Sequence, residues 1–243
     1  MKFGVLAPMP AELRPLVRRL GRPRAPADGG DGPRAYEGEV GTATVIATTA
    51  GIGRARATEA TRRLLERGDV DHVVVVGVAG GVDDRLAIGD VVVPRIVLDG
   101  PTGTEYRPHP VGDAADVTPQ GALHTSDELI LEPGRVAALR ARGVVALDME
   151  TAAVAAVCEA QRCPWSVVRA ISDRSADGLV DTAILRLSRP DGTPDPRAVV
   201  RFVLRHPRRI GHLVRLGRDL RIATGAAAAE ACHRLAAAAE AHD

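Results

Sequence analysis

Two apolar segments of this sequence end in carboxylates that could act on a bound ligand. Asp148 and Glu150 follow the run VVAL, and Ser172 and Asp173 follow the run SVVRAI. A carboxylate of the first pair could accept hydrogen bonds from both hydroxyl groups of a ribose diol. An acid near the start of a helix can also be present only because its negative charge interacts favourably with the helix dipole. The carboxylic acid of Asp173, in a partly dry pocket, could give its proton to a leaving group, although a Ser-Asp pair can also cap a turn.

A glycine-rich turn directly after the run HVVVV is the third segment that could bind a ligand. Its residues 77–81, GVAGG, would allow a flat base or an anion to approach exposed backbone N–H groups closely. A tight structural turn would explain the same glycines. The order G-x-G-x-x-G is missing, so the sequence gives poor support to a dinucleotide-binding oxidoreductase.

Strands and helices that alternate along the first two-thirds of the chain would position these segments. Residues 72–78 are apolar on both faces, which is typical of a parallel strand covered by helices on both sides. The alternation therefore predicts an α/β fold with a largely parallel sheet. The expected strands are residues 2–7, 42–49, 72–78, 91–98, 143–147 and 165–171, and the expected helices begin at Pro10, Arg54 and Thr151.

The composition is that of an ordinary globular protein. The chain has 243 residues, 45% of them hydrophobic and 26% charged, with a net charge of +1. These values exclude the disordered, collagen-like and disulfide-dense classes. The three cysteines lack the spacing of a zinc site, so no metal is expected, and no apolar stretch reaches the roughly 18–20 residues that span a bilayer. Pro8, Pro10 and Glu12 make the start a poor signal peptide and favour a cytoplasmic location.

The last quarter of the chain differs in composition, so we expect a catalytic domain over residues 1–190 and a basic helical extension over residues 191–243. Residues 197–221 contain eight arginines and a single acid, Asp219, interleaved with apolar side chains. Pro207 should divide this segment into two helices, followed by an Ala-rich helix over residues 226–241. The apolar face could pack on the domain, or the segment could contact an anionic membrane surface. Nucleic acid is not expected, because almost no aromatic residue is available to stack on a base.

Five segments, in order along residues 1–177, resemble the purine nucleoside phosphorylase and nucleosidase superfamily, in particular its methylthioadenosine/S-adenosylhomocysteine nucleosidase type. They are GVLAPMPAEL, TAGIGRARAT, VVGVAGGVDDRLAIGDVVVP, ALDMETAAVAAVC and VVRAISDRSAD. The resemblance implies a three-layer α/β fold with a central mixed, largely parallel twisted sheet flanked by helices, followed here by a helical tail. That tail resembles the one in the hopanoid-associated phosphorylase branch, which is thought to remove adenine from adenosylhopane.

The resemblance also implies which residues would serve an N-glycosidase. Asp173 matches the acid that hydrogen-bonds N7 of the purine, and Ser172 would help to orient it. Glu150 matches the acid that binds the ribose 2′- and 3′-hydroxyl groups, and Glu12 matches the acid that activates the attacking water. The remaining matches would line the base or the sugar: Met9, Ala79, Gly80, Leu129, Ile130 and Met149.

The implied reaction is cleavage of the N-glycosidic bond of a 5′-substituted adenine nucleoside by an enzyme that needs no cofactor. Adenosylhopane is the alternative substrate. A purine-nucleoside-binding protein without activity is the alternative from another class, although binding alone does not require three carboxylates. Members of the superfamily are usually dimers or larger, so a homodimer is expected.

Two departures from the family pattern bear on the nucleophile. Val78 stands where the nucleosidases usually have Ser or Thr. Residues 8–10 and 75–77 contain none of the arginines that usually hold phosphate in the phosphorylases, which favours water as the nucleophile. Phosphate could still bind as a co-substrate to Arg54 or to backbone N–H groups of residues 80–81.

A third departure concerns the wall of the site at the 5′ end of the substrate. Residues 99–120, rich in Gly, Pro and Asp, are expected to form a long loop, and loops of this length are often functional. The whole stretch between Leu98 and Thr125 is nevertheless much shorter than in the ordinary nucleosidase. A shortened wall would leave the 5′ end open, which would suit a bulky substituent.

Overall fold

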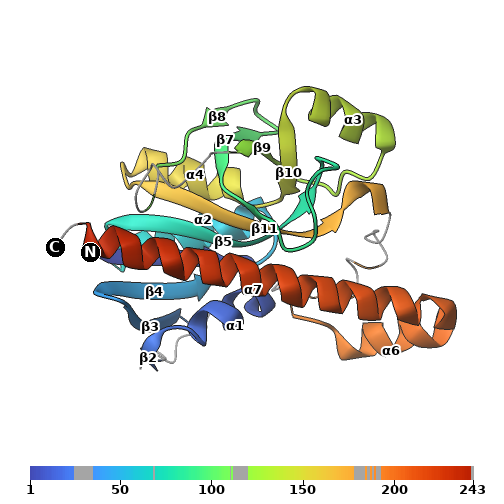
Figure 1. Cartoon of the computed structure of the whole chain (residues 1–243), viewed down its shortest axis with the longest axis horizontal. Coiled ribbons are helices and arrows are strands. Elements are labelled where there is room, and N and C mark those ends of the chain that lie inside the picture. The colour runs from blue at the N-terminus through green and yellow to red at the C-terminus, as the bar shows by residue number, and fades with distance from the viewer. Residues whose placement is uncertain are drawn as a thin grey trace.

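One mixed β-sheet with helices on both of its faces forms the centre of the molecule (Figure 1). The computed structural model describes residues 1–24, 35–67, 69–109, 111, 120–177, 184, 187, 189 and 193–241. The strands are β1 (Lys2–Ala7), β2 (Gly21–Arg24), β3 (Ala35–Val40), β4 (Ala43–Thr49), β5 (His72–Gly81), β6 (Val91–Val92), β7 (Pro94–Asp99), β8 (Glu105–Tyr106), β9 (Gln120–Thr125), β10 (Val144–Asp148) and β11 (Trp165–Arg174).

The strand order is β2-β3-β4-β1-β5-β10-β9-β7-β8, and β11 pairs with both β5 and β6. The pairings of β1 with β4 and β5, of β5 with β11, and of β9 with β7 and β10 are parallel. The contact between β5 and β10 is antiparallel and joins the two halves of the sheet. The expected fold, a mixed and largely parallel sheet between helices, is therefore confirmed.

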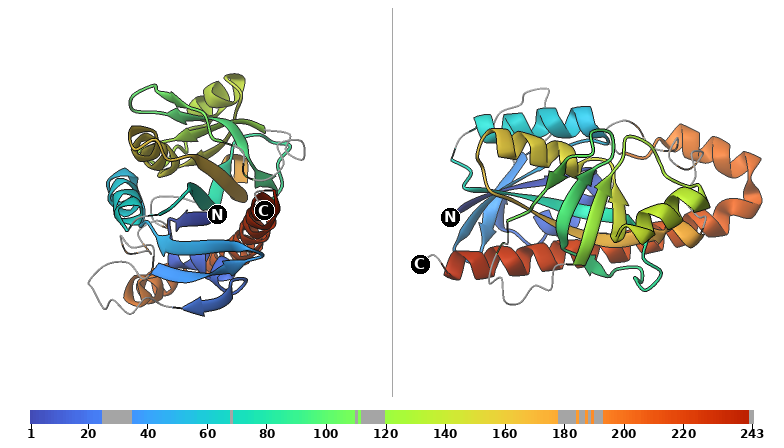
Figure 2. Two further views of the ribbon diagram at one scale, coloured as in Figure 1. Left: turned by 90° about the vertical axis from the view of Figure 1, so that its left-hand side faces the viewer. Right: turned by 90° about the horizontal axis from the view of Figure 1, so that it is seen from above.

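The side chains of β5 explain how the two helical layers are held. Val73 and Val75 pack on one face, while Val74 and Val76 pack on the other, and all four are buried. Because neighbouring side chains of a strand point to opposite faces, a continuous valine run makes both faces apolar. The first face is covered by α2 (Arg54–Glu66) and α4 (Thr151–Ala160), and the second by α1 (Pro10–Val17) and α7 (Ile210–Glu240) (Figure 2).

Some short elements escape the sequence pattern. The strand β2 is exposed along its whole length and β3 is well buried only at its ends, so neither shows a clear hydrophobic alternation. The single strand expected over residues 91–98 is two strands, because the chain changes partners: β6 pairs with β11, whereas β7 pairs with β9 and begins at Pro94, a residue tolerated at a strand start. The loop expected over residues 99–120 contains β8, which pairs with β7. Residues 110 and 112–119 of that loop lie outside the described part of the chain.

The end of the chain is one long helix where two helices are expected. Pro207 does separate α6 (Pro196–Arg205) from α7, with a short 3₁₀ turn, η3 (Pro207–Arg209), between them. The Ala-rich helix expected to begin at residue 226 is instead the second half of α7, so this boundary is wrong. Gly225 lowers helix propensity there, but the mostly small side chains on both sides of it pack closely on the sheet and hold the helix together. These buried residues are Ala223, Ala227, Ala228, Ala231, Leu235, Ala238 and Ala239.

The remaining helices are α3 (Pro133–Ala141) and the short 3₁₀ turn η2 (Ser175–Asp177), which follows β11. None of the helices in the described ranges combines the length and the hydropathy of a segment that crosses a bilayer. Within the same ranges, His, Cys, Asp and Glu side chains form no group of three or more that could hold a metal ion.

Candidate active site

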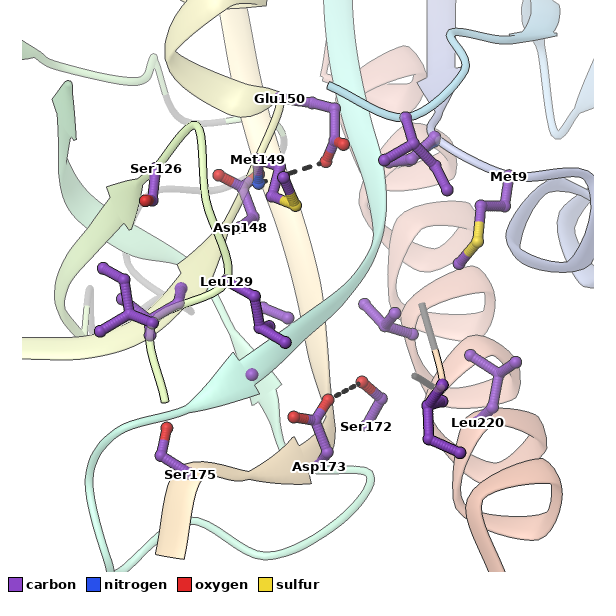
Figure 3. Close-up of a pocket in the computed structure, with 18 of the residues that line it drawn as sticks. Met9, Ser126, Leu129, Asp148, Met149, Glu150, Ser172, Asp173, Ser175 and Leu220 are labelled. Atoms are coloured by element: carbon purple, nitrogen blue, oxygen red, sulfur yellow. Dashed lines mark hydrogen bonds between the residues drawn. The ribbon is translucent and has the colours of Figure 1, made fainter. Parts of the chain in front are cut away.

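A cavity of about 320 Å³ lies at the ends of β5, β10 and β11 and is closed on one side by α7 (Figure 3). The lining comes from segments that are far apart in the sequence, because the ends of these strands meet at one edge of the sheet. All ten residues predicted for the site line this cavity: Met9, Glu12, Ala79, Gly80, Leu129, Ile130, Met149, Glu150, Ser172 and Asp173.

A β-bulge turns both Ser172 and Asp173 toward the cavity. In the pairing of β11 with β5, Ile171 lies opposite Ala79 and Asp173 lies opposite Gly80, so Ser172 is an extra residue. In a regular strand these two neighbours would point to opposite faces, and the bulge removes that constraint. The Ser172 hydroxyl donates a hydrogen bond of 2.7 Å to Oδ1 of Asp173 (Figure 3). Burial raises the pKa of Asp173 above its usual value, which favours a protonated acid that can donate.

Glu150 is held in the cavity by backbone N–H groups. Gly53, the residue before α2, donates from its N–H to Oε1 of Glu150 at 2.8 Å, and the N–H of Met149 lies 3.3 Å from Oε2. The carboxylate therefore lies at the N-terminus of α2, where the helix dipole favours negative charge. Burial and the neighbouring carboxylate of Asp148 nevertheless raise the pKa of Glu150. An oriented carboxylate of this kind can accept hydrogen bonds from neighbouring hydroxyl groups of a ligand.

Glu12, in the first turn of α1, is the least satisfied carboxylate of the site. Its Oε2 accepts a hydrogen bond of 2.8 Å from the N–H of Val78, and its Oε1 has no hydrogen-bond partner among the described residues. The side chain is only 1% exposed. Burial raises the pKa of Glu12 to about 8, against the opposing effects of the Arg169 guanidinium and the Val78 N–H. The hydrogen bond from Val78 to Glu12 comes from the backbone, so it does not depend on which side chain this position has.

Arg169 is a component of the site that the sequence analysis did not single out. It lies on β11, fully buried, and its Nη2 donates hydrogen bonds to Asp148 and, at 3.0 Å, to the hydroxyl of Thr151. Its guanidinium also lies 3.7 Å from Oε2 of Glu12 and 3.8 Å from Oε2 of Glu150. An arginine inside an apolar strand is a signal that could have been noticed, because a buried charge of this kind is nearly always paired.

The charge balance of this buried cluster decides the protonation of its members. One guanidinium faces three carboxylates, and Asp148 takes its direct hydrogen bond in addition to one of 2.7 Å from Thr125. With all three carboxylates ionised, the cluster would carry two uncompensated negative charges in a poorly solvated place. Ionisation is therefore least favoured at Glu12, which receives the fewest hydrogen bonds of the three.

The family is decided by the extent of a sequence match. The family model described as the phosphorylase superfamily matches residues 2–190. This chain belongs to the phosphorylase superfamily. It is 28% identical over 202 residues to a 5′-methylthioadenosine/S-adenosylhomocysteine nucleosidase of Shewanella frigidimarina, a match that covers 72% of this chain and 87% of the relative. A nucleosidase of the same name from Bacillus thuringiensis is 28% identical over 200 residues, with coverages of 71% and 86%.

Solved structures share the fold of this superfamily member. A methylthioadenosine/S-adenosylhomocysteine nucleosidase of Colwellia psychrerythraea in complex with adenine matches with a TM-score of 0.71 at 22% identity, over 97% of this chain and 94% of that chain. Futalosine hydrolase of Helicobacter pylori matches with a TM-score of 0.70 at 18% identity, over 99% and 98% of the two chains. At these identities the likeness extends to the fold alone.

The helix α7, beyond the matched residues of the superfamily, supplies part of the cavity wall. Leu216 and Leu220 line the cavity from this helix. Figure 3 shows Leu220 on this helix, at the edge of the cavity that lies across from Met149 and Asp148. Neither leucine was predicted for the site, because the basic composition of residues 191–243 indicated an extension separate from the catalytic domain. The apolar wall also receives Ile52, from the loop before α2.

Gly77, on β5, leaves no room for a side chain next to the charged cluster. A Cβ atom at this position would lie 1.9 Å from Oε2 of Glu12 and 2.6 Å from Nη1 of Arg169. No L side chain fits without displacing one of these two buried charged groups.

We therefore expect Gly77→Ala to lower the free energy of unfolding by about 1–3 kcal/mol, the usual cost of overpacking a core. Gly217→Ala is the matched control, because a Cβ at this helical position meets nothing within 4 Å, and alanine there should stabilise by roughly 0.5–1 kcal/mol. Denaturant unfolding of both variants measures the contrast. Equal stability of Gly77→Ala and the unmodified protein would contradict this account of the cluster.

Proposed function

We propose that this chain hydrolyses the N-glycosidic bond of a 5′-substituted adenine nucleoside and releases adenine, as the names of its nucleosidase relatives suggest. The observation that carries the proposal is the convergence of three carboxylates, Glu12, Glu150 and Asp173, from separate elements on one cavity. Each has a raised pKa or a set of donors that suits a different task, and a protein that only binds purines has no need of all three.

The proposed roles follow from the chemistry of the bond that breaks. Cleavage of the C1′–N9 bond sends the electron pair into the purine, and a proton from Asp173 to N7 makes the leaving group neutral adenine. The sugar becomes oxocarbenium-like and gains positive charge. The carboxylate of Glu150 accepts hydrogen bonds from the 2′- and 3′-hydroxyl groups and stabilises that charge. The oxygen of a water molecule then bonds to C1′ while its proton passes to Glu12 in its ionised form, the fraction that grows as the pH approaches the Glu12 pKa of about 8.

Water suits this cavity better than phosphate does. The buried cluster around Arg169 carries excess negative charge, which repels an anionic nucleophile. Arg54, the one cation considered for phosphate in the sequence analysis, is already engaged: its guanidinium lies 2.5 Å from Asp99 and 2.9 Å from Asp127. A phosphate co-substrate would have to displace these carboxylates.

The test is the release of adenine from methylthioadenosine, followed by chromatography with and without inorganic phosphate. We expect equal rates in phosphate and in a non-phosphate buffer, with a free 5-substituted ribose as the second product. A strict requirement for phosphate, with a ribose 1-phosphate as product, would overturn hydrolysis. Binding of the nucleoside without any release of base would instead support the purine-binding alternative.

A lipid nucleoside such as adenosylhopane is a second candidate substrate. The observation in its favour is the apolar wall that Leu216 and Leu220 contribute next to the predicted base and sugar residues. The same assay with methylthioadenosine, S-adenosylhomocysteine, adenosine and an adenosine with a long 5′-alkyl chain would rank the candidates by kcat/KM. We also propose that the enzyme is a homodimer and that it works in the cytoplasm. Sedimentation analysis of the purified protein would test the homodimer.

A further inference from the structure

The helices α6 and α7 present an unusual outer face to solvent. Among the described residues, the three most exposed large apolar side chains are Leu204 at 78%, Val214 at 67% and Val200 at 58%, and all three lie on these helices. Ile210, at the start of α7, is also exposed. The helices α6 and α7, joined by η3, form a helical hairpin. These four apolar residues and six exposed arginines are together called the outer face of the hairpin. The arginines are Arg197, Arg201, Arg205, Arg208, Arg218 and Arg221.

The spacing of these residues places them in one exposed stripe on each helix. On α6, Val200 and Leu204 are one helical turn apart, and Phe202, on another side of the helix, is buried. On α7, Ile210 and Val214 are likewise one turn apart, and Arg218 follows at the next turn. Figure 1 shows both helices projecting together beyond the end of the sheet.

The same stretch of α7 serves two different surfaces. Leu216 and Leu220 line the catalytic cavity, whereas Val214 and Arg218 are exposed to solvent. At 100° per residue, Val214 and Arg218 lie on the opposite side of the helix from Leu216 and Leu220. The exposed apolar residues are therefore not explained by the cavity or by the packing of the helix on the domain.

The charge of the outer face is positive and uncompensated within the described part of the chain. None of its six arginines forms an ion pair with a described carboxylate, although the chain as a whole has a net charge of only +1. Three nearby acids are used elsewhere. Asp219 is buried and lies 3.5 Å from Arg215, and Asp177 pairs with Arg174 and Arg215. Asp195 caps the start of α6 by accepting hydrogen bonds from the backbone N–H groups of Arg197 and Ala198. Arg209 packs over the ring of Phe202, 5.3 Å from its centroid.

We propose that the outer face of the hairpin docks on an anionic lipid bilayer. The exposed apolar side chains would enter the interface between headgroups and acyl chains, and the arginines would bind lipid phosphates. A nucleic acid would leave four apolar side chains in contact with water or with phosphates, and the only aromatic ring of α6, that of Phe202, is buried and covered by Arg209. The lipid surface is the partner that suits both parts of the face.

The test is flotation of the full-length protein with vesicles of phosphatidylcholine alone or with phosphatidylglycerol added. We expect binding to the anionic vesicles at least tenfold stronger than to the neutral ones, and weaker at 0.5 M salt than at 0.05 M because the arginines are exposed. Failure to bind anionic vesicles at low salt would overturn the proposal. This readout does not depend on nucleosidase activity, so it stands apart from the proposed function.

Variants locate the docking face. The double change Arg201→Glu with Arg218→Glu should weaken binding at least 30-fold, since each arginine near an anionic surface contributes about 1 kcal/mol. The control, Arg62→Glu with Arg95→Glu, makes the same change in charge on α2 and β7 and should weaken it far less. Leu204→Gln with Val214→Gln, which leaves the charge unchanged, should also weaken binding.

The outcomes separate a lipid partner from a second copy of the chain. Melting temperatures show that each variant is folded, and sedimentation shows its oligomeric state. If both double changes on the outer face leave vesicle binding as in the control, the proposal is wrong. It is also wrong if Leu204→Gln with Val214→Gln dissociates an oligomer while vesicle binding is unaffected, because the face would then join two protomers.

Discussion

Asp173→Asn should lower kcat for adenine release by about 10²–10⁴-fold, which corresponds to roughly 3–5 kcal/mol of transition-state stabilisation. Asparagine keeps the size of the side chain and can still accept a hydrogen bond from Ser172, so the bulge and the fold should persist. What it cannot do is transfer a proton to the leaving purine. Binding of the nucleoside should change little, so the loss should fall on kcat rather than on KM.

The choice of leaving group distinguishes proton donation from a structural role of Asp173. A riboside that releases p-nitrophenolate needs no protonation of its leaving group, so Asp173→Asn should cleave it at a rate close to that of the unmodified enzyme. Ser172→Ala should cost much less than Asp173→Asn on adenine nucleosides, because it removes only the hydroxyl that orients the acid. Equal losses on both kinds of substrate would assign Asp173 to the shape of the cavity instead.

The layers of the fold could be predicted from the sequence because their signals are local. The valines of β5 alternate between two cores, and a run that is apolar on both faces indicates a strand between helices. The strand β2, which is exposed throughout, has no such signal. The continuity of α7 through Gly225 was also hidden, because it depends on packing against the sheet rather than on helix propensity.

The site was predicted as a set of residues but not as an arrangement. Five family-like segments gave eight of the lining positions, and a separate match in TSDELI gave Leu129 and Ile130; the structure brings all ten together. The bulge at Ser172 and the buried guanidinium of Arg169 depend on partners in other elements, and a single sequence contains no record of those pairings. An arginine between VV and AI was the local clue to the cluster. Its three carboxylate partners lie at 12, 148 and 150, too far along the chain for a spacing rule.

Glu12→Gln should abolish most of the activity and at the same time stabilise the protein at alkaline pH. Glutamine cannot accept the proton of the attacking water, and loss of a general base typically costs about 10²–10⁴-fold in rate. Its amide oxygen can take the place of Oε2 and accept from the N–H of Val78, while its NH₂ group occupies the position of the unpartnered Oε1. The variant should therefore fold normally, and the residual rate measures the contribution of the base.

The gain in stability follows from the raised pKa of Glu12. Its carboxyl has a pKa of about 8 in the folded protein and its ordinary value, 4.5, when unfolded, so folding takes up a proton between these two values. Stability that is fully present below pH 4.5 is then lost as the pH rises toward 8, whereas glutamine has nothing to ionise. The difference in melting temperature between Glu12→Gln and the unmodified protein should grow steadily from pH 5 to pH 8. Glu59→Gln, on the exposed face of α2, is the control for the loss of a carboxylate at the surface. A constant difference for Glu12→Gln would mean that Glu12 is ionised throughout and that the cluster holds its proton on another carboxylate.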